Sequence, residues 1–534
     1  MKRLLKIVAL ALAGIVCLVL LVAAIALGRW YLKAGGPYPD YSLDFAKAGT
    51  LQGTPPETPL LVGVAKRDIT PVLDAYDKFV DKDGDNKYNP KKGDYFEDTN
   101  KNGKLDAVWI AGFGNNRPAQ GVHDPLWARA IAFENNGVRV VLVPVDIIGL
   151  FAEKIIDMRN RLDPSLKIDH LVVSSTHDHE APDTMGIWSV GLERPFWRFD
   201  YGYMELVKRS VVEAAEEAVR NLRPAKGHMA EVTAGPEGYV DDSRIPHVYD
   251  NVVRIARFED PATAETIATM LCWGNHPETV GSSNPLLTSD FPHFLREGVE
   301  KGVPDPNGIP GVGGMCLYFQ GQVGGLMTQL HTTVPQRNTG AMLREDTFEK
   351  AQALGENVAL LALGALRDGA RPMTDSSVAV AAKTFHAPVG NPVFNFAVFV
   401  GLVHPGWFGG KARTEVNALR VGNLEILTVP GEIYPEICEG GVEAPAGRDF
   451  NIAPVEVPPL RSQLKGDLTM IFGLANDELG YILPKSQWDV EPPFAYGLKE
   501  DQYGEENSFG PEAGPAIHKA SLEVIQSLHG ALGR

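Results

Sequence analysis

Apolar runs rich in β-branched residues alternate, beyond residue 60, with segments whose apolar positions recur every three or four residues. The clearest segment of the second kind, MELVKRSVVEAAEEAVRNL, covers residues 204–222, and residues 347–366 and 515–532 repeat its pattern. This spacing places apolar side chains on one face of a helix, whereas the short β-branched runs are typical of strands. The alternation predicts an α/β body that contains at least one mixed sheet.

The N-terminus carries a different pattern, an unbroken apolar run at residues 7–28 that follows three basic residues. At about 1.5 Å per helical residue, this run is long enough to cross the hydrocarbon core of a bilayer. Trp30 and Tyr31 follow it, as aromatic residues do at membrane interfaces. We expect residues 1–33 to form a transmembrane anchor with the body on the extracytoplasmic (periplasmic or extracellular) side. A signal peptide cleaved near residues 24–26 is the alternative.

Residues 34–59 are rich in Gly, Pro and Thr and lack periodicity, which is typical of a linker. The remaining residues, 60–534, are expected to form one catalytic domain. The chain has 50 Lys and Arg against 67 Asp and Glu, a net charge of −17, which argues against nucleic-acid binding. Three cysteines lie in the body, so at most one disulfide can form there: Cys272, Cys316 and Cys438.

Five of the apolar runs lead into residues that commonly bind metals or take part in catalysis. In α/β sheets, ligands bind just beyond the carboxyl ends of strands, so this arrangement predicts one shared site. The residues that follow these runs are Asp146, the pair His177 and His179, His276, Glu432 and Tyr481.

The His177 and His179 pair is the best candidate for metal binding. In an extended segment, residues two apart lie on the same face, and neutral imidazoles are zinc ligands. His276 and Glu432 are the residues best suited to complete the site. The alternative is a pair of hydrogen-bonded loop histidines. A metallo-β-lactamase site is excluded because Ala181 and Pro182 follow the pair, and the chain contains no GxSxG, HExxH or GxxxxGK[ST] motif.

Four groups of segments, in the same order and with similar spacing, resemble the catalytic domain of the neutral/alkaline (non-lysosomal) ceramidases. The resemblance extends from about residue 60 to residue 520. The segments are GVAKRDITP (63–71) with GVHDPLWARAIAFE (121–134), SSTHDHEAPDT (174–184), WGNHPETVGSSNPLLTSDFPHFLRE (273–297), and VPGEIYPEI (429–437) with GLANDELGYILPKSQW (473–488).

The resemblance implies a mixed-sheet α/β catalytic domain that hydrolyses an amide (N-acyl) or ester bond in a lipid-like substrate. It implies one zinc ion with four ligands: His177, His276, Glu432 and Tyr481. It also implies that His179 steers a water or a substrate oxygen, and that Arg244 and Tyr503 hold the scissile carbonyl. His123 and Asp146 are expected to support the site.

The chain departs from the family pattern at several positions. Where the family carries a catalytic serine, the segment FQGQVGGLMTQ (319–329) has Met327, and Thr328 is the nearest hydroxyl. Glu180 begins the tripeptide that replaces the Ser-Gly-Pro of the family. Only 53 residues follow Tyr481, so we expect no counterpart of the family's Ig-like C-terminal domain. We therefore expect a zinc hydrolase of ceramidase type in preference to a ceramidase proper.

An acidic insertion, DKDGDNKYNPKKGDYFEDTNKNGKLD, occupies residues 81–106. Alternate oxygen-bearing residues in a tight loop are what Ca²⁺ requires, so we expect structural calcium; a solvated acidic loop is the alternative. The first run supplies Asp81, Asp83 and Asp85, and the second supplies Asp98, Asn100, Asn102 and Asp106 with Gly103 at its turn.

Three functional hypotheses follow from these patterns. The first is a membrane-anchored, exported zinc hydrolase. The second is a catalytically inactive ceramidase-like surface protein that binds a lipid or glycan, which the methionine at the serine position favours. The third is a calcium-stabilised surface or adhesion protein, favoured by the acidic insertion alone.

Overall fold

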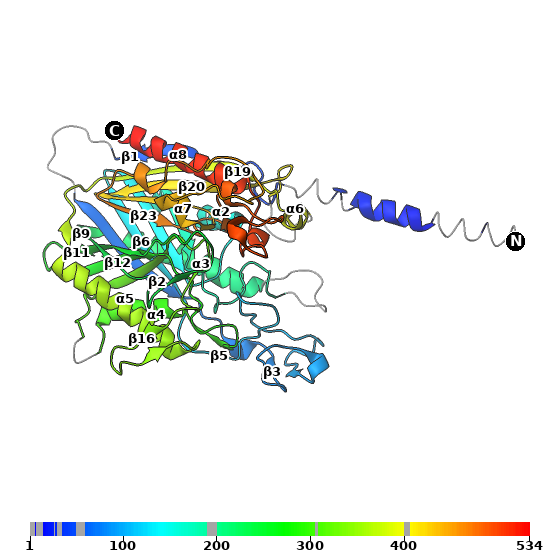
Figure 1. The fold of residues 1–534 in the computed structure, drawn as a ribbon. Coiled ribbons are helices and arrows are strands. Elements are labelled where there is room, and N and C mark those ends of the chain that lie inside the picture. The colour runs from blue at the N-terminus through cyan, green and yellow to red at the C-terminus, as the bar shows by residue number, and fades with distance from the viewer. Residues whose placement is uncertain are drawn as a thin grey trace.

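The structure, a computed structural model, describes residues 6, 14–25, 27–28, 35–49, 59–189, 200–304, 308–399 and 406–533. Two β-sheets pack face to face in the body, and helices cover the outer face of each sheet (Figure 1). The layers therefore run helix, sheet, sheet, helix.

The larger sheet has nine strands and is mixed. The β7–β8 and β12–β14 pairs are parallel and the other pairs are antiparallel, which confirms the prediction of a mixed sheet. Its order is β14 (Met315–Gln320), β12 (Thr266–Trp273), β11 (Val252–Glu259), β9 (Arg223–Thr233), β2 (Leu60–Asp68), β6 (Trp127–Asn135), β7 (Val138–Val145) and β8 (His170–Ser175), with β18 (Arg371–Pro372) paired to β9.

The smaller sheet has five strands, of which β21 and β23 pair in parallel. Its order is β1 (Asp44–Ala48), β19 (Val378–Pro388), β20 (Lys411–Val421), β21 (Leu424–Thr428) and β23 (Leu468–Phe472). Strand β1 lies inside the segment expected to be a linker. Its five residues pair antiparallel with β19 along an edge of the sheet, so part of that segment belongs to the folded body.

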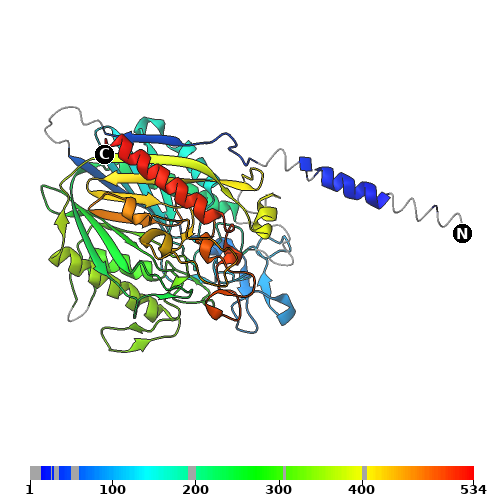
Figure 2. The same cartoon turned by 45° about the horizontal axis from the view of Figure 1, so that its top comes forward.

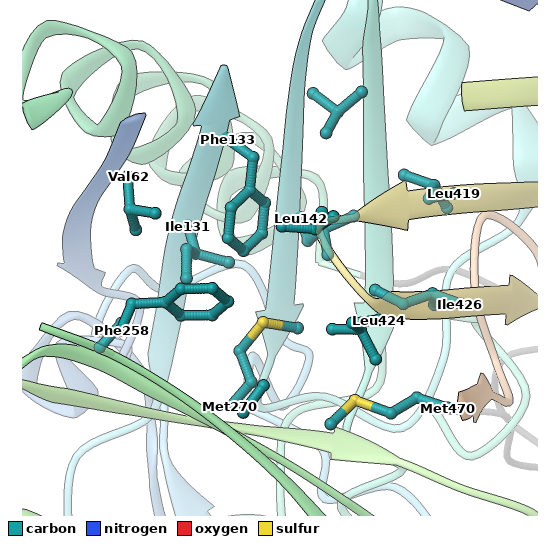
Figure 3. Packing of buried hydrophobic residues seen from close by; sticks show 14 of the residues in the cluster. Val62, Ile131, Phe133, Leu142, Phe258, Met270, Leu419, Leu424, Ile426 and Met470 are labelled. Atoms are coloured by element: carbon teal, nitrogen blue, oxygen red, sulfur yellow. The ribbon is translucent and has the colours of Figure 1, made fainter. Parts of the chain in front are cut away.

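The core between the two sheets follows from the two-residue period of the strands. Ile131 and Phe133 of β6 face the smaller sheet, where Leu419 and Ile426 belong to the same buried cluster (Figure 3). The alanines at alternate positions of β6 face the opposite side and pack with the helices there. Strands that are buried on both faces show continuous apolar runs, as the sequence does here.

The three predicted helices are confirmed, with ends within three residues of the expected ones. They are α3 (Tyr201–Arg220), α5 (Phe348–Asp368) and α8 (Ala513–Ala531). Helices α3 and α5 cover the larger sheet together with α2 (Ala152–Arg161) and α4 (Phe291–Lys301), and α8 lies across the smaller sheet (Figure 2). Two shorter helices are α6 (Pro392–Phe399) and α7 (Pro435–Glu439).

Short two- and three-residue strand pairs order the long connections. They are β3 (Lys78–Val80) with β4 (Tyr95–Glu97), β5 (Gly121–Val122) with β13 (Leu286–Leu287), β10 (Asp241–Asp242) with β15 (Met327–Thr328), β16 (Val334–Pro335) with β17 (Met342–Leu343), and β22 (Glu432–Ile433) with β24 (Tyr481–Ile482).

The N-terminal apolar segment is described only in part. Residues 14–25 are helical and exposed, and Figure 1 shows this helix apart from the body. Across the described ranges, no helix combines the length and the apolarity needed to cross a bilayer. The predicted transmembrane helix is therefore unsupported, and residues 1–5, 7–13, 26 and 29–33 of that prediction lie outside the described residues.

Candidate metal centre

The carboxyl ends of strands from both sheets meet at one edge of the body. The loop after β23 binds the end of β8, because Asn476 N donates to Val173 O (2.8 Å) and Ser175 N donates to Leu474 O (3.0 Å). Gly473 N donates in the same way to the last residue of β14 at 3.1 Å. These bonds bring the loops that carry His177, His276 and Glu432 to one place, as the strand-end pattern predicts.

Backbone carbonyls fix the orientation of two of the histidine rings. His177 Nδ1 donates to Ile148 O at 2.8 Å, and His276 Nδ1 donates to Met327 O at 2.7 Å. His177 has a φ of 65°, a left-handed conformation that turns the chain directly after β8. With Nδ1 occupied in both rings, each presents Nε2 to the site, which is the arrangement found for metal-binding histidines.

The ring nitrogens and one carboxylate oxygen converge on a single point. Glu432 Oε2 lies 3.0 Å from His276 Nε2 and 3.3 Å from His177 Nε2. His179 Nε2 lies 3.3 Å from His177 Nε2, and one nitrogen from each of the three histidines falls within a 4.8 Å cluster. This donor set, buried imidazoles with a carboxylate, suits a zinc ion.

The surroundings shift the pKa values of two groups in this cluster, Glu432 and His179. Burial opposes ionisation of Glu432, but His177 and His276 outweigh it and lower the pKa of this carboxyl to about 2. Burial and the two neighbouring imidazoles hold the pKa of His179 well below its usual value. The Glu432 carboxylate is therefore charged, as metal ligation requires, and the His179 ring is neutral.

Tyr481 and Tyr503 lie on one side of the cluster. The parallel β22–β24 pair places Tyr481 directly beside Glu432, which explains how residues 49 positions apart in sequence meet. The Tyr481 ring lies 5.6 Å from the Tyr503 ring in an edge-to-face contact. Tyr481 is buried, whereas Tyr503 is 46% exposed and so lies where the site meets solvent.

The Arg244 side chain contacts the backbone of Tyr503. Its guanidinium forms two hydrogen bonds with Glu505, at 2.6 and 2.7 Å, and donates to the backbone carbonyl of Tyr503 at 3.1 Å. Both charged side chains are 2% exposed. Arg244 is thus engaged by a buried ion pair and contacts Tyr503 through the backbone.

His123 and Asp146 have partners outside the histidine cluster. Asp146 accepts two hydrogen bonds from Arg296, at 2.7 and 2.9 Å. His123 stacks on Phe348 with 3.8 Å between ring centroids, and its Nδ1 lies 2.8 Å from Asp124. Asp146 directly follows β7 and so supports the edge of the sheet on which the site is built.

The segment at residues 319–329, where the family carries its serine, contributes to the site through a backbone carbonyl and a threonine hydroxyl. Met327 is buried, and its carbonyl holds His276. The Thr328 hydroxyl donates to Glu278, a buried carboxylate that sequence reasoning missed. Glu278 lies two residues after His276, the same spacing that drew attention to His177 and His179.

The acidic insertion forms two separate loops. In the first, Asp94 joins the predicted Asp81 and Asp83 in a cluster of carboxylates. Lys92 Nζ lies 2.8 Å from Asp83 and 2.5 Å from Asp85, so an ammonium group faces this run.

In the second loop, Asp98 accepts from the backbone N–H of Gly103 at 2.7 Å, and Asp106 accepts from the side-chain amides of Asn100 and Asn102, both at 2.6 Å. The four predicted side chains are thus brought together.

Comparisons with known proteins place this geometry in context. No family model matches the chain. It is 23% identical over 325 residues to the neutral ceramidases of Drosophila melanogaster and Drosophila pseudoobscura pseudoobscura, covering 54% of this chain and 46% of each relative. The chain therefore spans about half the length of the curated relatives it matches.

The fold is that of solved ceramidases. The neutral ceramidase from Pseudomonas aeruginosa superimposes with a TM-score of 0.60 at 14% identity, over 89% of this chain and 75% of that one. A ceramidase complexed with C2 gives 0.61 at 14% identity, over 88% and 75%. Together with the sequence matches, this fold supports a divergent neutral-ceramidase-like domain.

Proposed function

We propose that this protein is a zinc-dependent hydrolase that cleaves an amide (N-acyl) or ester bond in a lipid-like substrate. The observation that carries the proposal is the convergence of three buried side chains: Glu432 Oε2 lies within 3.3 Å of both His177 Nε2 and His276 Nε2. The sequence similarity to neutral ceramidases supports the class of reaction. Export and membrane anchoring belong to the same proposal and rest on the N-terminal sequence alone; fractionation of expressing cells tests them.

The predicted residues at this centre have distinct roles in this chemistry. His177, His276 and Glu432 would hold the zinc, with Tyr481 as the fourth ligand that the resemblance implies. A bound zinc polarises a carbonyl and lowers the pKa of its water towards about 7. His179 faces the same point and orients the attacking water or the substrate oxygen. The exposed Tyr503 holds the scissile carbonyl, and Arg244 positions Tyr503 through its backbone.

The absence of the family's serine determines which nucleophile we propose. Met327 offers no hydroxyl, and the Thr328 hydroxyl is already bonded to Glu278. The reaction is therefore attack by water, with no covalent serine step. The second candidate function, an inactive lipid- or glycan-binding protein, is favoured by the same methionine but gives the buried ligand cluster no role.

The experiment that separates these candidates is hydrolysis by the purified full chain. We expect it to cleave a fluorescent short-chain N-acylsphingosine or its ester counterpart, to lose this activity with 1,10-phenanthroline, and to regain it with added zinc. Binding of the same lipids without turnover, in zinc-loaded protein, would leave the inactive binding protein as the better account.

We also propose that the acidic insertion binds structural calcium, because oxygen-bearing side chains gather in both loops. Calcium is expected to raise the melting temperature of the full chain, and the rise should shrink in an Asp98→Ala variant. A melting temperature that calcium leaves unchanged in the parent chain would contradict this assignment.

A further inference from the structure

The mechanism above leaves one buried carboxylate of the site without a role. Glu278 is 2% exposed and follows His276 by two residues. Its Oε2 lies 3.4 Å from His179 Nδ1, and its Oε1 accepts the hydroxyl proton of Thr328. A threonine, a carboxylate and an imidazole therefore form a chain that leads towards the metal centre.

The surroundings of His179 leave its ring little freedom. Gly112 lies so close that a Cβ there would fall 2.7 Å from His179 Cβ, and the Phe113 ring meets the imidazole edge-to-face at 5.4 Å. On the other side, His179 Nε2 faces His177. Within the described residues, the buried Nδ1 of His179 has no well-aligned hydrogen-bond acceptor. Glu278 is the group placed to accept a hydrogen bond from it.

The three histidines differ in what faces Nδ1. His177 and His276 donate to backbone carbonyls, whereas His179 faces a carboxylate. A carboxylate that accepts from an imidazole fixes the ring's tautomer and raises the basicity of its other nitrogen.

We infer that Glu278, held in place by the Thr328 hydroxyl, is a positioning residue that aims His179 Nε2 at the metal centre. The inference rests on the proposed function, since it assumes that a metal occupies the cluster. It also assigns a role to the hydroxyl beside Met327: Thr328 acts through Glu278 instead of facing the substrate.

The test uses the full chain with Glu278→Gln, Thr328→Val and Thr328→Ser substitutions. Glu456→Gln is the matched control, because Glu456 is equally buried, bonds the backbone N–H of Lys485 and lies in another loop. Zinc affinity is measured by competition with a chromophoric chelator, and turnover is measured on the N-acyl or ester substrate. The Nδ1–H proton of His179 is followed by imidazole ¹⁵N NMR, with a His179→Ala variant to assign it.

We expect Glu278→Gln to lower turnover by about 10-fold or more and to abolish the protected Nδ1–H signal. Zinc binding is expected to persist, because His179 is not one of the four proposed zinc ligands. Thr328→Val is expected to diminish the Nδ1–H signal, Thr328→Ser to restore it, and Glu456→Gln to leave turnover and signal unchanged. If the parent chain binds zinc but Glu278→Gln keeps its turnover and its Nδ1–H signal, this inference fails and the proposed function stands. If the parent chain binds no zinc, both fail.

Discussion

Replacing His276 with alanine is expected to remove the zinc and to reduce hydrolysis by about 1,000-fold or more. His276 contributes a nitrogen 3.0 Å from the Glu432 carboxylate, and its loss leaves that buried negative charge with one imidazole fewer. A 1,000-fold loss corresponds to about 4 kcal/mol of transition-state stabilisation. Zinc content and turnover of the same N-acyl or ester substrate are measured on one preparation of each variant.

His247→Ala is the matched control, because this histidine is exposed and belongs to no part of the cluster. It is expected to keep both zinc and activity. Full turnover in the zinc-free His276→Ala variant would show that the reaction does not depend on this centre, and that result would contradict the proposed mechanism.

Substitution of Glu505 with glutamine is expected to lower the free energy of unfolding by about 3–5 kcal/mol, because it leaves the buried guanidinium of Arg244 without a counter-charge. Both side chains are 2% exposed, and the pair also holds the segment that carries Tyr503. Urea unfolding of the full chain measures the effect. Glu297→Gln, which breaks an exposed pair with Lys301, is expected to change stability by less than about 1 kcal/mol.

The double variant Arg244→Met with Glu505→Gln sharpens this test. Since the cost comes from an uncompensated charge, removal of both charges is expected to recover part of the stability lost in Glu505→Gln. Stability unaffected by Glu505→Gln alone would mean that Arg244 is not committed to this pair and is free to meet the substrate directly.

The fold was predictable to the extent that it is recorded in local periodicity. The helix at residues 201–220 and the strands that end before Asp146, His177 and His276 follow from apolar spacing alone. Strand β1 did not, because its five residues are mostly exposed and are ordered only by pairing with β19, more than 300 residues later in the chain. Sequence spacing carries no signal for an edge strand of this kind.

The candidate site, like the fold, was predictable only in part. The convergence of His177, His276 and Glu432 was predictable, since each follows a strand whose carboxyl end lies at the same edge of the body. The buried ion pair between Arg244 and Glu505 was not predictable, because it joins segments that no local sequence pattern connects. Glu278 was missed although it stands two residues after a candidate ligand, since a glutamate in a loop is ordinarily a solvated group.

The metal content of the purified full chain tests the central claim most directly. After dialysis against metal-free buffer, elemental analysis is expected to find one zinc per chain. Parallel preparations of His177→Ala and His276→Ala are expected to contain none. A parent chain that holds no zinc, even after incubation with zinc and removal of the excess, would contradict the account of this cluster as a metal centre.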